Sequence, residues 1–208
     1  DAAEGDYFGW SVAIAGDTVV VGTMSGAAAY VLRTTDNWDT HTEIKLTASD
    51  GVSSDDFGYS VAIDGNTVVV GAWYDADNGS MSGSAYVFLT TDGGATYDEV
   101  AKLTASDGAY GDNFGVSVAI DGDTVVVGAE QTYSEGPGAA YVYRTTDGWS
   151  THTEIKLTAS DGASEDLFGH SVAIDGETVL VGAYEADPVP RDSGSAYVFR
   201  TSDGGVTY

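Results

Sequence analysis

The sequence predicts an all-β fold assembled from four similar units, and three observations support this prediction. Phe-Gly-x-Ser-Val-Ala-Ile occurs four times, beginning at Phe8, Phe57, Phe114 and Phe168. Each copy continues through a glycine turn to a Thr-Val run and then to an Ala-Tyr-Val run. The copies are 49, 57 and 54 residues apart. Repeats of this length, made of short β-type runs, are typical of propellers and related arrays.

The second repeat shows how the first two strands are predicted. Residues 60–63 form a short apolar strand that leads into Asp64-Gly65-Asn66, a strong hairpin signal that requires positive φ angles. Residues 67–71 follow as an unbroken β-branched run, which suits a strand that is buried on both faces.

The third and fourth strands complete the unit. Residues 83–88 form the third strand, and a Thr-Asp-Gly-Gly turn leads to a fourth run at 97–103 that carries Asp98, Glu99 and Lys102. Charge on an outer strand protects a sheet edge from pairing with other chains. Four antiparallel strands with a buried inner pair make one propeller blade. We therefore expect a single β-propeller-type domain, or an excerpt of a larger one, with blades at about 1–47, 48–104, 105–158 and 159–208.

A longer period overlies the single repeat. Residues 33–51 return almost unchanged as residues 144–162, 111 positions later, which indicates duplication of a two-blade unit. The fourth repeat lacks its outer strand, because Tyr208 corresponds to Tyr97, where that strand would begin. We expect the missing strand to resemble residues 98–103 and to come from further chain or from an adjacent subunit. The duplication of a two-blade unit favours an even total number of blades or an open-ended array.

These motifs resemble the FG-GAP repeat. The resemblance rests on the Phe-Gly starts, on Val-Gly-Ala at 70–72, 127–129 and 181–183, and on the Ala-Tyr-Val strands. It implies the β-propeller of integrin α-chains and of many extracellular proteins of bacteria and unicellular eukaryotes. Family members often carry a calcium loop between the first two strands. Here that connection is a tight turn such as 64–66, too short to supply six to eight oxygen ligands, so the family's metal residues are not carried over.

Composition narrows the classes of partner. Asp and Glu number 33 against seven Lys and Arg, which gives a formal charge of −26. Binding to nucleic acid requires clustered basic residues, and the sequence excludes it. No apolar run approaches the length of a membrane span, so membrane insertion is not expected. The acidity suits a saline or calcium-rich setting, and we expect an extracellular or cell-surface protein.

Two hypotheses explain the acidic loops between blades. Each loop carries Asp-Gly-x-x-x-Asp, and either the carboxylates bind Ca²⁺ or they accept backbone N–H groups and shape the turn. The three pairs are Asp50 with Asp55, Asp107 with Asp112, and Asp161 with Asp166. A second candidate for calcium is Asp75-x-Asp77, a partial match to a calcium loop that lacks the distal Glu.

The loops between second and third strands vary most between repeats and are candidate ligand-binding segments. They contain aromatic side chains that could stack on sugars, namely Trp73, Tyr74, Tyr133 and Tyr184. Asn78 begins an Asn-Gly-Ser glycosylation sequon in one of these loops. The residue after each Phe-Gly is interpreted as a packing or entrance position.

The sequence shows no Ser/His/Asp order, no phosphate-binding glycine loop and no His/Cys metal set, and we expect no enzyme activity. The favoured function is a non-catalytic extracellular scaffold or adhesion module that mediates protein–protein or cell-surface interactions, as part of a surface or filament protein. The partner would be a protein or a glycan at the acidic variable-loop face. The alternatives are a calcium-dependent glycan-binding module and a propeller attached to an extracellular enzyme.

Overall fold

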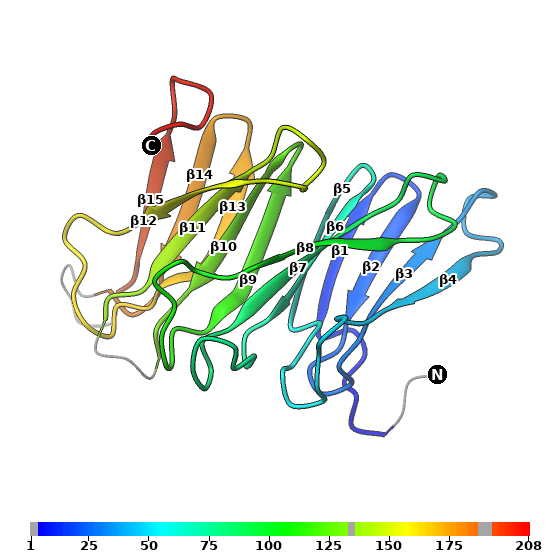
Figure 1. The fold of residues 1–208 in the computed structure, drawn as a ribbon, viewed down its shortest axis with the longest axis horizontal. Coiled ribbons are helices and arrows are strands. Elements are labelled where there is room, and N and C mark those ends of the chain that lie inside the picture. The colour runs from blue at the N-terminus through cyan, green and yellow to red at the C-terminus, as the bar shows by residue number, and fades with distance from the viewer. Residues whose placement is uncertain (1–3, 133–135, 187–192) are drawn as a thin grey trace.

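The computed structural model describes residues 4–132, 136–186 and 193–208, and these residues form strands and turns without helix. The strands make four antiparallel sheets, called blades 1 to 4, each of which meanders in sequence order. Figure 1 shows the blades side by side, from blue at the N-terminus to orange and red at the C-terminus. The all-β, propeller-type prediction is confirmed. The four sheets form an open arc and do not close into a ring.

Blades 1 and 2 each have four strands. Those of blade 1 are β1 (Ser11–Ala15), β2 (Thr18–Gly22), β3 (Ala29–Arg33) and β4 (Thr42–Leu46). Those of blade 2 are β5 (Ser60–Asp64), β6 (Thr67–Ala72), β7 (Ser84–Leu89) and β8 (Asp98–Leu103).

Blade 3 also has four strands, and blade 4 has three in the described part of the chain. Those of blade 3 are β9 (Phe114–Asp121), β10 (Thr124–Ala129), β11 (Ala139–Arg144) and β12 (Thr153–Leu157). Those of blade 4 are β13 (Phe168–Asp175), β14 (Thr178–Ala183) and β15 (Ser195–Arg200). The innermost strands of blades 3 and 4 begin at Phe114 and Phe168, three residues before the Ser of the Ser-Val-Ala-Ile run, because a bulge extends their pairing.

The first hairpin of each blade turns on a glycine. In blade 2, Asp64 pairs with Thr67, which leaves Gly65 and Asn66 as a two-residue loop. Gly65 has a φ of 53°, while Asn66 is not among the residues with positive φ. A turn with positive φ only at its first central position favours glycine there and matches the twist of the strands it joins.

The hydrophobic core lies between the blades. Three clusters of buried side chains fill the joints between blades 1 and 2, 2 and 3, and 3 and 4. At the first joint, Phe57 packs edge-on against Tyr86 and Phe88 and belongs to the same cluster as Val20 and Val31 of the preceding blade. The unbroken Val runs are buried because each inner strand faces a neighbouring blade on both sides.

A hydrogen bond to the Phe-Gly glycine repeats at every joint. The hydroxyl of the Ser that begins each Ser-Val-Ala-Ile run donates to the glycine carbonyl of the next blade. The donors and acceptors are Ser11 and Gly58 at 2.8 Å, Ser60 and Gly115 at 2.7 Å, and Ser117 and Gly169 at 2.7 Å. The two signature segments of successive repeats are therefore joined directly.

Glycine is required where these backbones approach. A Cβ on Gly71 of β6 would lie 2.1 Å from the carbonyl oxygen of Gly115, and a Cβ on Gly115 would lie 2.3 Å from the carbonyl oxygen of Ser84. Gly115 also has a φ of 92°, which an L-residue rarely adopts. The Phe-Gly and Val-Gly-Ala glycines are thus the two sides of one close contact between blades.

The hairpins form a second link between neighbouring blades. Asp64 accepts the backbone N–H of Gly122 at 2.7 Å, and Asp121 accepts that of Gly176. Blade 1 has Ala15 at the corresponding position, so its hairpin cannot make this bond. The Asp of the Asp-Gly turn therefore has a role in holding blades together besides shaping its own turn.

The outward faces of the end blades are apolar. Phe8 is 47% exposed, whereas the equivalent Phe57 is 1% exposed, because no described blade precedes blade 1. On blade 4, Leu180 and Val198 are exposed at positions where the inner blades bury valine. Within the described residues, blades 2 and 3 are therefore covered on both faces and blades 1 and 4 on one.

We predict that Gly115→Ala destabilises the protein far more than Gly122→Ala does. Gly122 also has positive φ, but a Cβ there would meet no atom within 4 Å. The first change adds a backbone clash to conformational strain and should cost at least about 3 kcal/mol. The second adds strain alone, about 1 kcal/mol. Urea denaturation of both variants measures the difference, and equal losses would contradict the role given to the inter-blade contact.

Candidate functional site

The loop face is the side of the arc that carries the loops between second and third strands and the linkers between blades. Most of the predicted site residues lie here. The second Asp of each linker pair is buried and accepts the backbone N–H three residues before it. These bonds join Asp55 to Val52 at 2.8 Å, Asp112 to Ala109 at 2.8 Å and Asp166 to Ala163 at 2.7 Å. Their contacts are those of turn capping.

The first Asp of each linker pair has a different partner. It accepts the hydroxyl of the Tyr in the Ala-Tyr-Val strand of the blade that follows. The pairs are Asp50 with Tyr86 at 2.9 Å, Asp107 with Tyr141 at 2.7 Å and Asp161 with Tyr197 at 2.9 Å. The linker carboxylates therefore divide between two structural roles, one within the loop and one toward the third strand.

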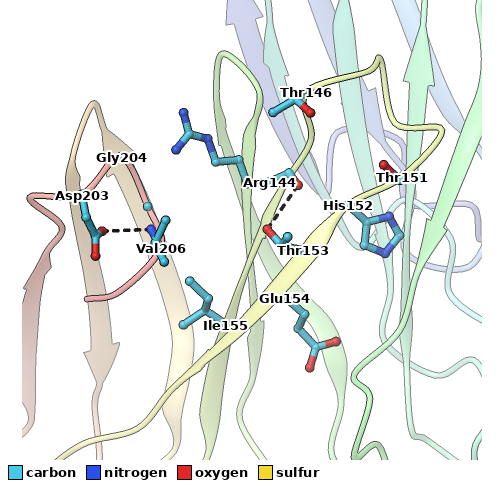
Figure 2. A pocket seen from close by; sticks show the side chains of 11 residues that line it. Arg144, Thr146, Thr151, His152, Thr153, Glu154, Ile155, Asp203, Gly204 and Val206 are labelled. Atoms are coloured by element: carbon cyan, nitrogen blue, oxygen red, sulfur yellow. Dashed lines mark hydrogen bonds between the residues drawn. The ribbon is translucent and has the colours of Figure 1, made fainter.

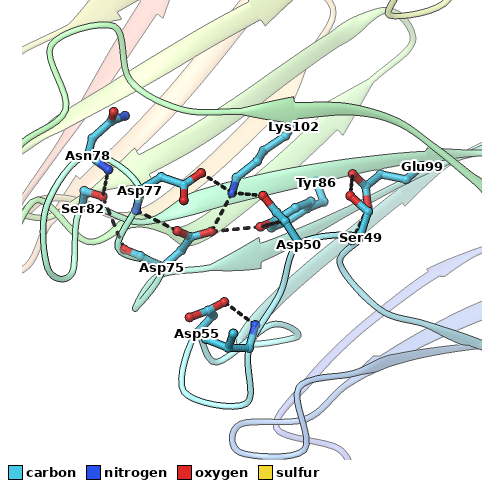
Figure 3. Close-up of polar contacts among 11 residues, drawn as sticks. Ser49, Asp50, Asp55, Asp75, Asp77, Asn78, Ser82, Tyr86, Glu99 and Lys102 are labelled. Carbon is cyan, nitrogen blue, oxygen red and sulfur yellow. Dashed lines mark hydrogen bonds and ion pairs between the residues drawn. The ribbon is translucent and has the colours of Figure 1, made fainter.

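In blade 2, a lysine lies at the centre of three of the predicted carboxylates and the tyrosine that binds two of them (Figure 3). The ammonium of Lys102, from β8, contacts Asp50 at 2.7 Å, Asp75 at 3.0 Å and Asp77 at 2.5 Å. It also lies 5.1 Å from the centre of the Tyr86 ring. The Asp75-x-Asp77 half-loop and the linker Asp50 are thus brought together around a protein cation.

The electrostatics of this cluster depend on Lys102. The Asp75 side chain is only 5% exposed, and burial alone would raise its pKa. Hydrogen bonds from Lys102 and Tyr86 outweigh burial, and the net shift of the Asp75 pKa is downward. The hydrogen bond from Lys102 likewise lowers the pKa of Asp50. Burial would lower the pKa of Lys102, but its carboxylate partners raise it, so the lysine stays charged.

These contacts bear on the calcium hypothesis. Calcium would have to displace Lys102 at Asp50, Asp75 and Asp77, or break the turn bonds of the second linker Asp residues. Within the described residues, no group of three or more His, Cys, Asp or Glu side chains is arranged to hold a metal ion. The predicted carboxylates are thus engaged with Lys102, tyrosine hydroxyls and backbone N–H groups, and Ca²⁺ binding stays a hypothesis from the sequence.

We predict that Lys102→Met costs about 3 kcal/mol of stability at pH 7, because it leaves the buried Asp75 without its counter-ion. The matched control is Lys156→Met, which removes one exposed contact, with Asp107 at 2.6 Å, and should cost less than about 1 kcal/mol. Asp50 and Asp75, two of the carboxylates that bind Lys102, have lowered pKa values, so their stabilisation is present above about pH 4 and is lost as pH falls through the folded values. The difference in free energy of unfolding between wild type and Lys102→Met, measured by urea denaturation, should therefore become smaller in acid.

A calcium titration at constant ionic strength tests the metal hypothesis. From the contacts above we expect EDTA-treated protein to melt at the same temperature in about 1 mM CaCl₂ and in NaCl of equal ionic strength, because both only screen the acidic loops. A saturable rise in melting temperature that sodium does not reproduce would instead show that these carboxylates bind calcium.

A row of aromatic rings crosses the loop face at the ends of β1 and β5. It is called the aromatic strip and consists of Trp10, Tyr59, Trp73 and Tyr74. Successive ring centres are 5.5, 5.3 and 5.0 Å apart. Trp10 is 49% exposed and Tyr74 39% exposed, while the two middle rings are half-buried. The strip therefore offers a continuous apolar surface that spans two blades.

A second aromatic group lies near this strip. The His170 ring is 4.5 Å from the Tyr184 ring, and its Nδ1 lies 2.7 Å from Glu130. Burial raises the pKa of Tyr59, and the charges of Glu130 and Asp56 raise it further. Glu130 thus contacts His170 directly and is close enough for its charge to raise the pKa of Tyr59. The strip and the His170 group are neighbours around one carboxylate.

The structure adds residues that the sequence analysis did not nominate. Trp73, Tyr74 and Tyr184, which the sequence nominated for ligand binding, lie in the two aromatic groups, whereas Tyr133 falls outside the described residues. Trp10, Tyr59 and His170 join them from the position after Phe-Gly, which had been interpreted as packing or entrance. The signal was available, since this position alone changes within an otherwise constant Phe-Gly-x-Ser-Val-Ala-Ile. Asn78 of the sequon is exposed in the β6–β7 loop, and its glycosylation stays a prediction.

Comparison with known proteins places the repeats in one family. The model of the FG-GAP repeat matches residues 1–31, 41–88, 97–143 and 151–199. The search of curated proteins gave no match. No helix long and apolar enough to cross a membrane occurs in the described part of the chain.

Two solved structures show a similar fold. Sqt1 of Saccharomyces cerevisiae matches with a TM-score of 0.56 and 10% identity, over 88% of this chain and 44% of that one. The intramolecular trans-sialidase of the leech matches with a TM-score of 0.50 and 13% identity, over 88% of this chain and 29% of that one. This chain thus spans less than half the length of either structure, and the likeness is one of fold.

Proposed function

This chain belongs to the FG-GAP repeat family, and we propose that it is a non-catalytic extracellular module of the scaffold or adhesion type, which binds a partner at its loop face. The observation that carries this proposal is the aromatic strip. The side chains that recur in every repeat have structural partners instead. The Phe of Phe-Gly fills the joints, the Ser and Gly of the signature link the blades, and the linker Asp residues cap turns or bind lysine. Trp10 and Tyr74 are large, exposed and specific to single repeats, as expected of a recognition surface.

The surroundings of the strip define the kind of partner. Asp56 and Glu130 place carboxylates beside the rings, and the whole chain carries a charge of −26. Aromatic rings bordered by acceptors suit a basic protein segment, which offers cations to both the rings and the carboxylates. A protein partner on a cell surface or in a filament is therefore the first candidate.

A glycan is the second candidate, and the row of exposed rings supports it. Sugars pack their apolar faces on exposed rings while neighbouring carboxylates accept hydrogen bonds from their hydroxyl groups. Trp10 and Tyr74 at the two ends of the strip are separated by two further rings, enough for more than one sugar unit. In this arrangement glycan binding would not require calcium.

We predict that the double variant Trp10→Ala, Tyr74→Ala lowers attachment of protein-coated beads to cultured cells at least about tenfold, as expected when aromatic anchors of an interface are removed. Tyr110→Ala is the control, since Tyr110 is a loop aromatic outside the strip that is more exposed than Trp10 or Tyr74. Loss of attachment after protease treatment of the cells identifies a protein partner, and loss after periodate oxidation identifies a glycan. Attachment that the double variant leaves unchanged, or that no coated bead shows, would contradict the proposal.

A further inference from the structure

Arg33, the last residue of β3, lies at the joint between blades 1 and 2 without an acidic partner. The chain has 33 Asp and Glu against seven Lys and Arg, and Lys102 and Lys156 each bind at least one carboxylate. Arg33 forms no ion pair within the described residues. Its charge reaches Tyr97, whose pKa burial raises and Arg33 lowers in part. The guanidinium therefore keeps its hydrogen-bond donors for an external anion.

The turn after β7 fixes the position of this arginine. A Cβ on Gly94 would lie 2.9 Å from Cδ and 3.4 Å from Nη1 of Arg33, so glycine leaves room for the arginine to pack on the turn. At the joint between blades 2 and 3, Leu89 and Trp149 occupy the positions of Arg33 and Gly94, and Trp149 is 4% exposed. Because apolar residues fill that joint, packing alone does not require an arginine.

A small pocket of about 240 Å³ lies beside Arg33, between the β3–β4 hairpin and the turn after β7. It is lined by the guanidinium, by the imidazole of His41, by residues 92–95 and by three threonines, namely Thr35, Thr40 and Thr42. Pockets that hold whole drug-sized ligands measure about 300–1,000 Å³. This pocket therefore suits a single charged group of a larger molecule.

The carboxylate in the lining, that of Asp92, is bound within its own turn. It accepts the hydroxyls of Thr90 and Thr96 at 2.9 and 2.7 Å and the backbone N–H groups of Ala95 and Thr96 at 2.9 and 3.0 Å. These hydrogen bonds, foremost that from the Thr96 N–H, lower the pKa of Asp92 and surround its charge with donors. The net charge of the chain opposes anions at long range, but at about 0.15 M salt exposed charges are largely screened beyond about 8 Å.

The same arrangement recurs two blades further along the chain (Figure 2). Arg144, the last residue of β11, lies beside the turn that contains Gly204 and Gly205, and a Cβ on either glycine would lie 3.2 Å from its Nη1. Arg144 also forms no ion pair within the described residues, and His152 occupies the position of His41. The arginine and its glycine turn are thus kept together in both copies of the two-blade unit.

We propose that the Arg33 pocket and its copy at Arg144 bind an oxyanion, either a sulfate or a carboxylate, of an acidic sugar. A guanidinium presents two parallel N–H groups to either anion. The threonine hydroxyls and the His41 imidazole offer hydrogen bonds to the neighbouring hydroxyl groups of the sugar. These pockets lie among the hairpin turns, on the side of the blades opposite the loop face. The inference is therefore independent of the aromatic strip and goes beyond the proposed function.

The test follows backbone amide signals by two-dimensional NMR while three sugars are added at constant ionic strength of about 0.15 M. The sugars are glucuronate, glucose sulfated at its primary hydroxyl, and glucose itself. We expect saturable shifts at Gly93 and Gly94, and at Gly204 and Gly205, with at least one of the two acidic sugars and none with glucose. The acidic sugar that saturates at the lower concentration identifies the oxyanion.

Arg33→Lys is the decisive variant, because it keeps the charge and removes the paired N–H groups. It should weaken binding at Gly94 about tenfold and leave binding at Gly205 unaltered, so the second pocket reports that the variant is folded. Lys156→Gln removes a positive charge on the loop face and should leave both pockets unchanged. The proposal is overturned if neither acidic sugar shifts these signals, if glucose shifts them equally, or if Arg33→Lys binds as tightly as the wild type.

Discussion

The close approach of two backbones at each joint is the constraint on which the rest of the structure depends. A Phe-Gly glycine places its carbonyl against the Val-Gly-Ala glycine of the preceding blade, and a serine hydroxyl donates to that carbonyl. Side chains at either glycine would separate the sheets and open the buried clusters between them. Phe57 and its equivalents can fill those joints only because the backbones meet at this distance. The family motif is therefore a description of an interface, not of one blade.

Local patterns were enough to predict the strands and turns, because alternation, β-branched runs and Asp-Gly turns act within a few residues. The partners of the acidic side chains were not accessible in this way. Asp50 and Asp55 look like one pair in the sequence, but Asp50 binds Lys102 and Tyr86, which are 52 and 36 residues away. The contact between the Trp10 and Tyr59 rings likewise depends on how one blade stacks on the next. Such contacts follow from the register between repeats, which no single repeat encodes.

The acidity of the chain has a partly structural origin. In every blade an Asp after the third strand accepts hydrogen bonds from the turn that follows, and these bonds lower the pKa values of Asp36, Asp92, Asp147 and Asp203. Linker carboxylates satisfy further backbone N–H groups, as Asp55 does for Val52. Backbone N–H groups in a tight turn have no carbonyl partner from a helix or a sheet. A carboxylate at the turn supplies the missing acceptor. Much of the negative charge therefore comes from carboxylates that accept hydrogen bonds in the many tight turns and linkers.

Nearest-neighbour joints give the molecule the thermodynamics of a linear chain of coupled units. Each blade is stabilised by its own sheet and by the blades beside it, and among the described residues blades 2 and 3 share two interfaces and blades 1 and 4 share one. Amide protons in the middle of the arc should accordingly exchange through rarer openings than those near its ends. Folding can begin at any adjacent pair and spread outward, because each step needs only the neighbour already in place. Length can then change by whole blades without redesign of the remainder.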